Sequence, residues 1–156
     1  ARRPAPPLAM TYADLARLHS ASFSLPRPWS EAEFAGLLAS PAVFLVSDPS
    51  GFALGRVAAD EGELLTLAVD PAARRQGAGR RLLAEFEAQA TARGAASAFL
   101  EVADGNAAAL ALYLSAGWTP TGRRPGYFSD SAGRTEDALV LSRMLGAGAA
   151  DSLTKR

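Results

Sequence analysis

The sequence predicts an α/β protein (α+β in another convention), with a mixed sheet of six or seven strands and helices on both faces. Apolar runs of strand length alternate with amphipathic helical patterns along the chain. A strand–helix–strand unit across residues 63–102 is typical of a right-handed crossover between two parallel strands. Turn signals before and after that unit predict hairpins, whose strands are antiparallel, so the sheet should be mixed.

Two helices and three strands are expected in the N-terminal half. Apolar residues at helical spacing over 11–23, behind a threonine cap, predict the first helix. A capping-box pattern, Ser30 with Glu33, begins a second, short helix that should stop at Pro41. The sequence Asp-Pro-Ser-Gly then predicts a hairpin turn between the first two of three strand-like runs. These runs are 42–48, 51–59 and 63–70.

The C-terminal half begins with a long helix. It should start near Gly77 and end at Gly94, because apolar residues recur on one face between them. The run 96–104 is continuously apolar, which predicts a strand buried on both faces and paired in parallel. A second helix should follow, with Asn106 as its cap and Gly117 past its end. The chain closes with two strand-like runs that should form a hairpin, 118–128 and 135–145.

The composition excludes several kinds of chemistry. The chain has no cysteine, which removes disulfides, thiol catalysis and zinc–thiolate sites. Its single histidine, His19, cannot form a metal cluster alone, and we expect it to be an ordinary, partly exposed helix residue. We therefore expect no metal. Acidic and basic residues balance at 16 each, so net charge gives no support for nucleic-acid binding.

The chain reads as one domain. Its 156 residues suffice for one real core, and no apolar run approaches the length of a membrane span. No signal-peptide pattern opens the sequence. We expect a single cytoplasmic domain over 8–145, monomeric or weakly dimeric and bound to no membrane, with flexible tails at 1–7 and 146–156.

Arginines and glycines surround the turn before the long helix. A P-loop would need Lys-Ser or Lys-Thr after its second glycine, and a dinucleotide fingerprint would need a third glycine where Leu82 stands. What remains is Arg74-x-x-Gly77-x-Gly79, leading directly into a helix. Free backbone N–H groups and the positive end of the helix dipole suit a pyrophosphate there. An exposed basic helix start is the alternative.

This stretch resembles the acetyl-CoA-binding signature, Q/R-x-x-G-x-G/A, of the GNAT acetyltransferase superfamily. The resemblance continues through "LEVADGNAAALALYLSAGW" and "GRRPGYFSDSAGRTEDALVL". Together with "PWSEAEF", these segments are similar to the RimI branch, which acetylates the N-terminal alanine of ribosomal proteins. The resemblance implies acetyl-CoA as cosubstrate and the N-terminus of a ribosomal protein as acceptor. A small-molecule amine, a protein lysine, or a non-catalytic acyl-CoA sensor remain alternatives.

The resemblance also implies site residues. Glu101 would be the general base, and it lies in an apolar strand where an unpaired carboxylate is costly. Tyr113 would protonate the departing thiolate, although from pattern alone it would be a core residue. Acetyl-CoA would be bound by Leu67, Ala68, Val69, Arg74, Arg75, Gln76, Gly77, Ala78, Gly79, Arg80 and Asn106. The acceptor would be bound by Trp29, Glu63, Arg124 and Tyr127.

Overall fold

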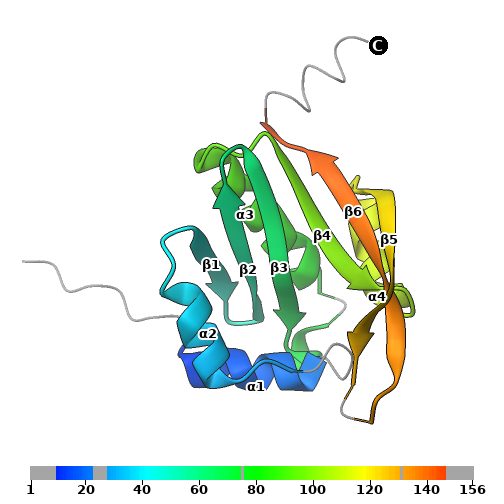
Figure 1. Cartoon of the computed structure of the whole chain (residues 1–156). Helices are drawn as coiled ribbons and strands as arrows, with labels where there is room; N and C mark the ends of the chain where they lie inside the picture. Colours follow the sequence, from blue (N-terminus) through cyan, green and yellow to red (C-terminus); the bar gives the residue numbers. More distant parts are fainter. Residues whose placement is uncertain (1–9, 23–27, 75, 131, 147–156) are drawn as a thin grey trace, which may run out of the picture.

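The fold is built on a six-stranded sheet with the strand order β1-β2-β3-β4-β6-β5 (Figure 1). The computed structural model describes residues 10–22, 28–74, 76–130 and 132–146. β3 and β4 run parallel, and every other neighbouring pair is antiparallel. The predicted mixed class is therefore confirmed. The strands are β1 (Val43–Asp48), β2 (Gly51–Ala58), β3 (Glu61–Val69), β4 (Ser97–Ala103), β5 (Thr119–Ser129) and β6 (Thr135–Met144).

Helices cover both faces of the sheet, as predicted. α1 (Tyr12–Ser22) and α2 (Glu31–Leu38) pack on one face, where Phe34 and Phe52 belong to one hydrophobic cluster. α3 (Ala78–Ala92) and α4 (Ala107–Ser115) cover the other face, around Phe86 and Trp118. A 3-10 turn, η1 (Pro71–Ala73), joins β3 to α3. None of the helices in the described part of the chain is long and apolar enough to cross a membrane.

Reciprocal caps start both N-terminal helices. Ser30 Oγ accepts from the Glu33 N–H at 3.2 Å, and Glu33 Oε1 accepts from the Ser30 N–H at 3.1 Å. Thr11 Oγ1 and Asp14 Oδ2 exchange the same pair of bonds before α1, at 3.1 and 3.0 Å. Because these bonds satisfy N–H groups that have no partner inside the helix, short local patterns are enough to set where each helix begins.

Two local expectations are wrong. β4 is fully buried on one face only: Leu100 is fully buried, whereas Phe99 and Glu101 on the other face keep part of their surface exposed. α1 and α2 pack over the β1–β3 side of the sheet and leave this face of β4 to a cleft. His19 is 1% exposed rather than partly exposed. It follows Leu15 by one helical turn and so lies on the apolar stripe of α1.

The two parallel strands part halfway along their length. β3 and β4 pair only over 61–64 and 97–100, although β3 continues to Val69 and β4 to Ala103. Beyond Leu64, the described residues of β3 and β4 form no further strand pairing with each other. Backbone N–H and C=O groups are costly to bury without a partner, so the gap is suited to a ligand with amide groups of its own.

A β-bulge at Leu65 accompanies this parting. Opposite β2, the register shifts between Leu54 and Gly55, so that Leu65 has no partner of its own. A bulge bends a strand and reverses which face the following side chains occupy. Leu64 packs in the cluster beneath α3, whereas Thr66 bonds to His19 of α1.

α3 begins at a backbone conformation that favours glycine. Gly77 precedes the helix with φ at +75°, in the left-handed region. At Gly79 a Cβ atom would lie 3.1 Å from Leu112 Cδ2 of α4. The first glycine thus serves the turn, and the second allows α3 and α4 to approach closely.

Replacing Gly77 by alanine should destabilise the fold through backbone strain alone, since a Cβ there meets no atom within 4 Å. We expect Gly77→Ala to lower the free energy of unfolding by roughly 1–2 kcal/mol in urea denaturation. Gly36→Ala is the control, because Gly36 lies inside α2 with open space around it. That variant should gain up to about 1 kcal/mol. Equal effects of the two changes would contradict this account.

Candidate active site

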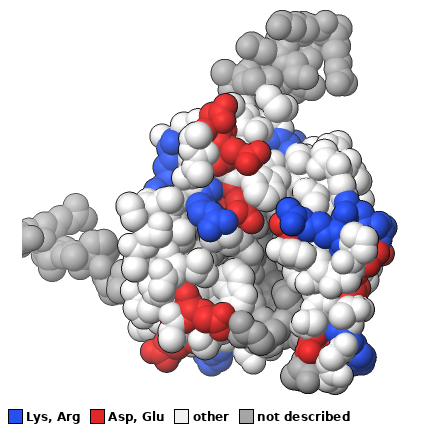
Figure 2. Space-filling view, viewed as in Figure 1, with Lys and Arg blue, Asp and Glu red and all other residues white. Residues whose placement is uncertain are grey.

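A cleft of about 900 Å³ opens where β3 and β4 part. One group of lining residues comes from the start of α3 and from α4, including Gly77, Gly79 and Tyr113. A second group comes from the opposite face of the sheet, including Trp29 and Glu101. The cleft therefore passes through the sheet and connects its two faces. On the face shown in Figure 2, basic side chains lie over β5 and acidic ones over α2.

The start of α3 has the chemistry of an anion site. Among the described residues, the Arg81 N–H is the first to bond at the helix start, to Gly77 O at 3.0 Å, and the N–H groups of the first turn point toward the helix end. Gly77 has no side chain with which to cap them. These donors and the positive end of the helix dipole suit phosphate groups, and the cleft residues present here fit those of acetyl-CoA.

The arginines of this turn have different partners. Arg74 is exposed and lines the cleft. Arg80 also lines it, but its guanidinium donates to Ser115 Oγ at 2.9 Å and to Ser115 O at 3.1 Å, at the end of α4. Arg81 pairs with Asp48 at 3.3 Å. Of the other predicted phosphate ligands, Gly77, Ala78 and Gly79 line the cleft, Gln76 is exposed outside its lining, and Arg75 lies outside the described residues.

The predicted residues of β3 divide between two faces. Leu67 and Val69 line the cleft, whereas the Ala68 side chain is buried in the α1–α2 cluster. The Ala68 side chain therefore points away from the gap, and only its backbone groups can meet a ligand there. Asn106 lines the cleft and caps α4, since its Oδ1 accepts from the Ala109 N–H at 3.2 Å. Its predicted capping role is confirmed.

Glu101 is a largely buried carboxylate held beside a cation. Its side chain is 13% exposed, and Arg124 Nε lies 3.4 Å from Oε2. Among the described residues, Oε2 is buried and accepts no hydrogen bond. The Arg124 guanidinium also lies over the Tyr127 ring, 5.2 Å from its centroid. The expected partner for a buried carboxylate is present, and one oxygen keeps the capacity to accept a further donor.

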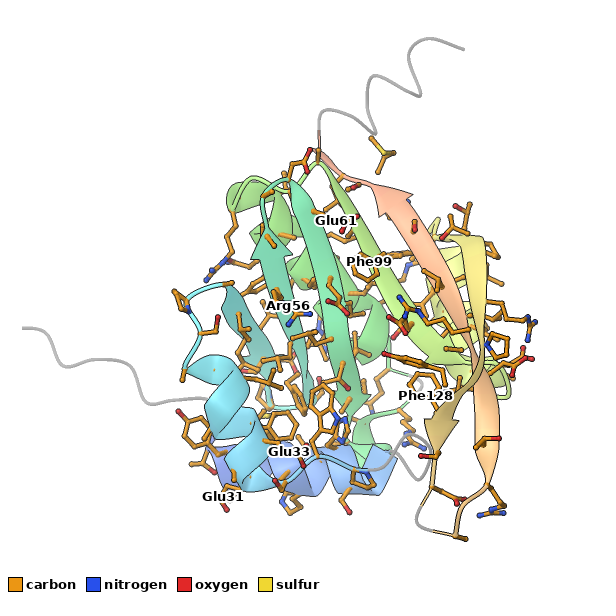
Figure 3. The ribbon with its side chains drawn as sticks, viewed as in Figure 1. Glu31, Glu33, Arg56, Glu61, Phe99 and Phe128 are labelled. Atoms are coloured by element: carbon orange, nitrogen blue, oxygen red, sulfur yellow. The ribbon has the colours of Figure 1, made fainter. Side chains whose placement is uncertain are left out.

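Glu63 is a second carboxylate on the same face. It pairs with Arg56 of β2, and its register partner on β4 is Phe99. Figure 3 labels Arg56 and Phe99 on this face of the sheet. Burial, and then the negative charge of Glu101 and Glu63, raise the pKa of the Tyr127 hydroxyl against the opposing effect of Arg124. The negative charges of both carboxylates therefore favour the protonated form of one phenol, Tyr127, at the wall of the cleft.

Tyr113 reaches the cleft from α4. It is 7% exposed, and its ring lies 6.3 Å from that of Trp118. Burial raises the pKa of Tyr113, because a phenolate would lose its hydration in this setting. The hydroxyl is therefore held in its protonated form, as a proton donor must be.

Sequence reasoning missed His19 and Thr66, which both line the cleft. The spacing of His19 from Leu15 was the available signal for its burial. Trp29 lines the cleft and also packs, with its ring 4.9 Å from His19 and 5.5 Å from Phe34. Across the described ranges, no group of three or more acidic or histidine side chains could hold a metal ion.

A family model and the relatives found by sequence comparison all indicate one family. The acetyltransferase (GNAT) family model matches residues 8–118. The ribosomal protein bS18-alanine N-acetyltransferase of Escherichia coli K12 is 39% identical over 119 residues, covering 74% of this chain and 80% of the relative. The N-alpha-acetyltransferase RimI of Mycobacterium tuberculosis H37Rv is 39% identical over 147 residues, covering 86% and 89%.

Similar folds are found among known structures. The crystal structure of the ribosomal-protein-S18-alanine N-acetyltransferase from E. coli has a TM-score of 0.75 at 32% identity, covering 88% of this chain and 92% of that one. Ard1 from Thermoplasma volcanium has a TM-score of 0.73 at 25% identity, covering 86% and 91%. The chain therefore belongs to the GNAT family of acetyltransferases and is an N-acetyltransferase that uses acetyl-CoA.

Proposed function

We propose that this enzyme acetylates the N-terminal α-amine of a ribosomal protein that begins with alanine. The observation that carries the proposal is a cleft with phosphate-binding features at one face of the sheet and two carboxylates, Glu63 and Glu101, at the other. The E. coli and M. tuberculosis relatives, named as an alanine N-acetyltransferase and an N-alpha-acetyltransferase, support an α-amine as the acceptor. The proposal treats residues 8–145 as one catalytic domain, working in the cytoplasm as a monomer or weak dimer.

An α-amine suits a site with a modest base. With reference pKa values of about 7.8 and about 10.4, roughly 14% of an α-amine is neutral at pH 7, against roughly 0.04% of a lysine. Glu101 is the carboxylate nearest to this role, and Arg124 Nε holds it from 3.4 Å. Because a larger fraction of an α-amine is already neutral, a carboxylate base has far less deprotonation to perform on an α-amine than on a lysine.

Acetyl-CoA supplies the acetyl group as a reactive thioester. Its phosphates would bind at the start of α3, and its amide-bearing arm would run along the edge of β3 that has parted from β4. The side chain of Arg74 would close over the phosphates, and Asn106 would meet the arm. The full set assigned to acetyl-CoA is Leu67, Ala68, Val69, Arg74, Arg75, Gln76, Gly77, Ala78, Gly79, Arg80 and Asn106.

The reaction would be a direct transfer, because the chain has no cysteine to carry the acetyl group. The amine nitrogen attacks the thioester carbonyl carbon, while Glu101 takes the amine proton through a water molecule. A backbone N–H near Ala68 or Val69 would stabilise the developing oxyanion. As the C–S bond breaks, the Tyr113 hydroxyl gives its proton to the sulfur and is reprotonated from solvent.

The peptide would enter on the face that carries α1 and the β5–β6 hairpin. Glu63 would attract the terminal ammonium, and the rings of Trp29 and Tyr127 would flank the first residues. Arg124 would hold the Glu101 carboxylate and the Tyr127 ring in place through its two contacts. The assigned acceptor-binding residues are thus Trp29, Glu63, Arg124 and Tyr127.

The first test is CoA release with peptides that begin with alanine, beside peptides whose only free amine is a lysine and a set of small amines. We expect turnover on the alanine peptides and at least about a tenfold loss of kcat in both Glu101→Gln and Tyr113→Phe. Glu61→Gln and Tyr12→Phe are matched controls, because both residues are exposed and lie outside the cleft.

The panel also separates the rival functions. Preference for lysine peptides or small amines would overturn the α-amine proposal and keep the acetyltransferase. Tight acetyl-CoA binding without turnover on any acceptor would indicate a sensor. Full activity in Glu101→Gln or Tyr113→Phe would remove that residue from the mechanism.

The raised pKa of Tyr113 has a consequence for the pH profile. A donor whose pKa is raised stays protonated as the pH increases, so its contribution should persist where an ordinary tyrosine ionises. We expect the ratio of wild-type to Tyr113→Phe kcat to stay constant from about pH 7 to about pH 10. A ratio that falls by half near pH 10 would mean that Tyr113 titrates at its ordinary value.

Arg74 provides a test of the phosphate end. Arg74→Gln should raise the KM for acetyl-CoA by roughly threefold to tenfold and leave the KM for peptide unchanged. The control is Arg17→Gln on α1, where Arg17 pairs with Asp14 at 3.7 Å. An unchanged KM for acetyl-CoA in Arg74→Gln, or an equal rise in both variants, would place the phosphates elsewhere.

A further inference from the structure

The only histidine of the chain links three segments that meet at the cleft. His19 lies on α1, and its Nε2 is 3.1 Å from Thr66 Oγ1 on β3. Its Nδ1 accepts from the Trp29 backbone N–H at 3.0 Å, just before α2. The imidazole is buried and also lines the cleft. Both ring nitrogens therefore have partners on segments that are distant in sequence.

The partners determine which nitrogen carries the proton. A backbone N–H can only donate, so Nδ1 of His19 must be unprotonated to receive the bond from Trp29. In the neutral ring, Nε2 then carries the hydrogen and donates to Thr66 Oγ1. The ring also stacks on the Trp29 indole at 4.9 Å with an interplanar angle of 19°. His19 thus holds both the main chain and the side chain of Trp29.

The position of Trp29 gives this contact its function. Trp29 comes just before α2, and it lines the cleft on the α1 side of the sheet. Thr66 stands directly after the bulge, on the strand that leaves β4. His19 therefore connects the Trp29 wall to the strand whose bend opens the cleft. The start of α3 and Tyr113 lie on the opposite face.

We infer that His19 is a positioning residue for the acceptor peptide, acting by holding Trp29 at the wall of the cleft. The inference rests on the proposed function, because it takes the acceptor to be a peptide that enters on this face. Loss of the Nδ1 bond would release Trp29 without disturbing the face that binds acetyl-CoA. The KM for peptide should then rise while the KM for acetyl-CoA stays constant.

Two amide substitutions separate the two nitrogens. A glutamine amide reaches the place of Nε2 and can still bond Thr66, but it offers nothing at Nδ1. An asparagine amide lies near Nδ1 and can still accept from the Trp29 N–H. We expect His19→Gln to raise the peptide KM about tenfold, His19→Asn to raise it less than about threefold, and neither to change the acetyl-CoA KM. Ser20→Ala, on the exposed side of α1, is the control.

Partial unfolding would produce a different pattern. Irreversibly unfolded enzyme lowers the apparent kcat and leaves both KM values unchanged. Reversible unfolding raises the apparent KM for peptide and for acetyl-CoA alike, because either substrate must draw the enzyme back to its folded state. An unchanged peptide KM in His19→Gln would therefore overturn the inference, whatever the loss of kcat. An equal rise in His19→Asn would also overturn it, because the acceptor at Nδ1 would then have no special role.

A second readout does not depend on turnover. The chain has two tryptophans, so Trp118→Phe leaves Trp29 as the sole indole. In that background, His19→Gln should shift the Trp29 emission to the red and increase its quenching by acrylamide, and His19→Asn should do so less. Unchanged emission would overturn the inference. If the wild type acetylates no α-amine, the proposed function and the peptide part of the inference fail together, whereas emission still reports whether His19 holds Trp29.

Discussion

The active site depends on an interruption of backbone pairing. β3 and β4 bond as parallel strands up to Leu64 and Leu100, and the bulge at Leu65 then bends β3 away. In the described part of the chain, the strands do not pair with each other along the gap, and buried peptide groups need some other partner, such as water or a ligand. A ligand in the gap can therefore bond to the strand edges where β3 and β4 do not pair with each other. The same gap connects two faces, so a donor from one face and an acceptor from the other can meet inside it.

Arginine side chains hold the chemistry around the gap in place. On the face of the sheet that carries α1 and α2, Arg124 pairs with Glu101 and Arg56 pairs with Glu63. Such half-exposed pairs add little stability, and their effect is to hold a charged oxygen at a defined point. Arg80 binds the last turn of α4, where a cation complements the helix dipole. The dense arginine cluster of the sequence therefore serves several contacts, and the proposed phosphate binding would be one among them.

Local signals in the sequence predict the elements, and they do not predict the opening between them. Ser30 with Glu33 places a helix start through bonds between near neighbours. The bulge at Leu65 arises from register against β2, which no short pattern encodes. The spacing of His19 from Leu15 predicts a buried side chain, but the polarity of histidine favoured the prediction of an exposed one. Tyr113 matches both the core and the catalytic interpretation, since it is buried and lines the cleft. Only the family resemblance predicted a role for it.

Each wall of the acceptor side is attached to one of the two parting strands. His19 attaches the Trp29 wall to β3 through Thr66. On the other side, Arg123 of β5 bonds Asp104, which follows β4, at 2.9 Å, and Asp137 of β6 at 3.0 Å. In the proposed mechanism, the separation of β3 and β4 would therefore set both the gap for the thioester and the distance between the walls for the peptide. Because both distances depend on the same two strands, one backbone feature would align the amine with the carbonyl that it attacks.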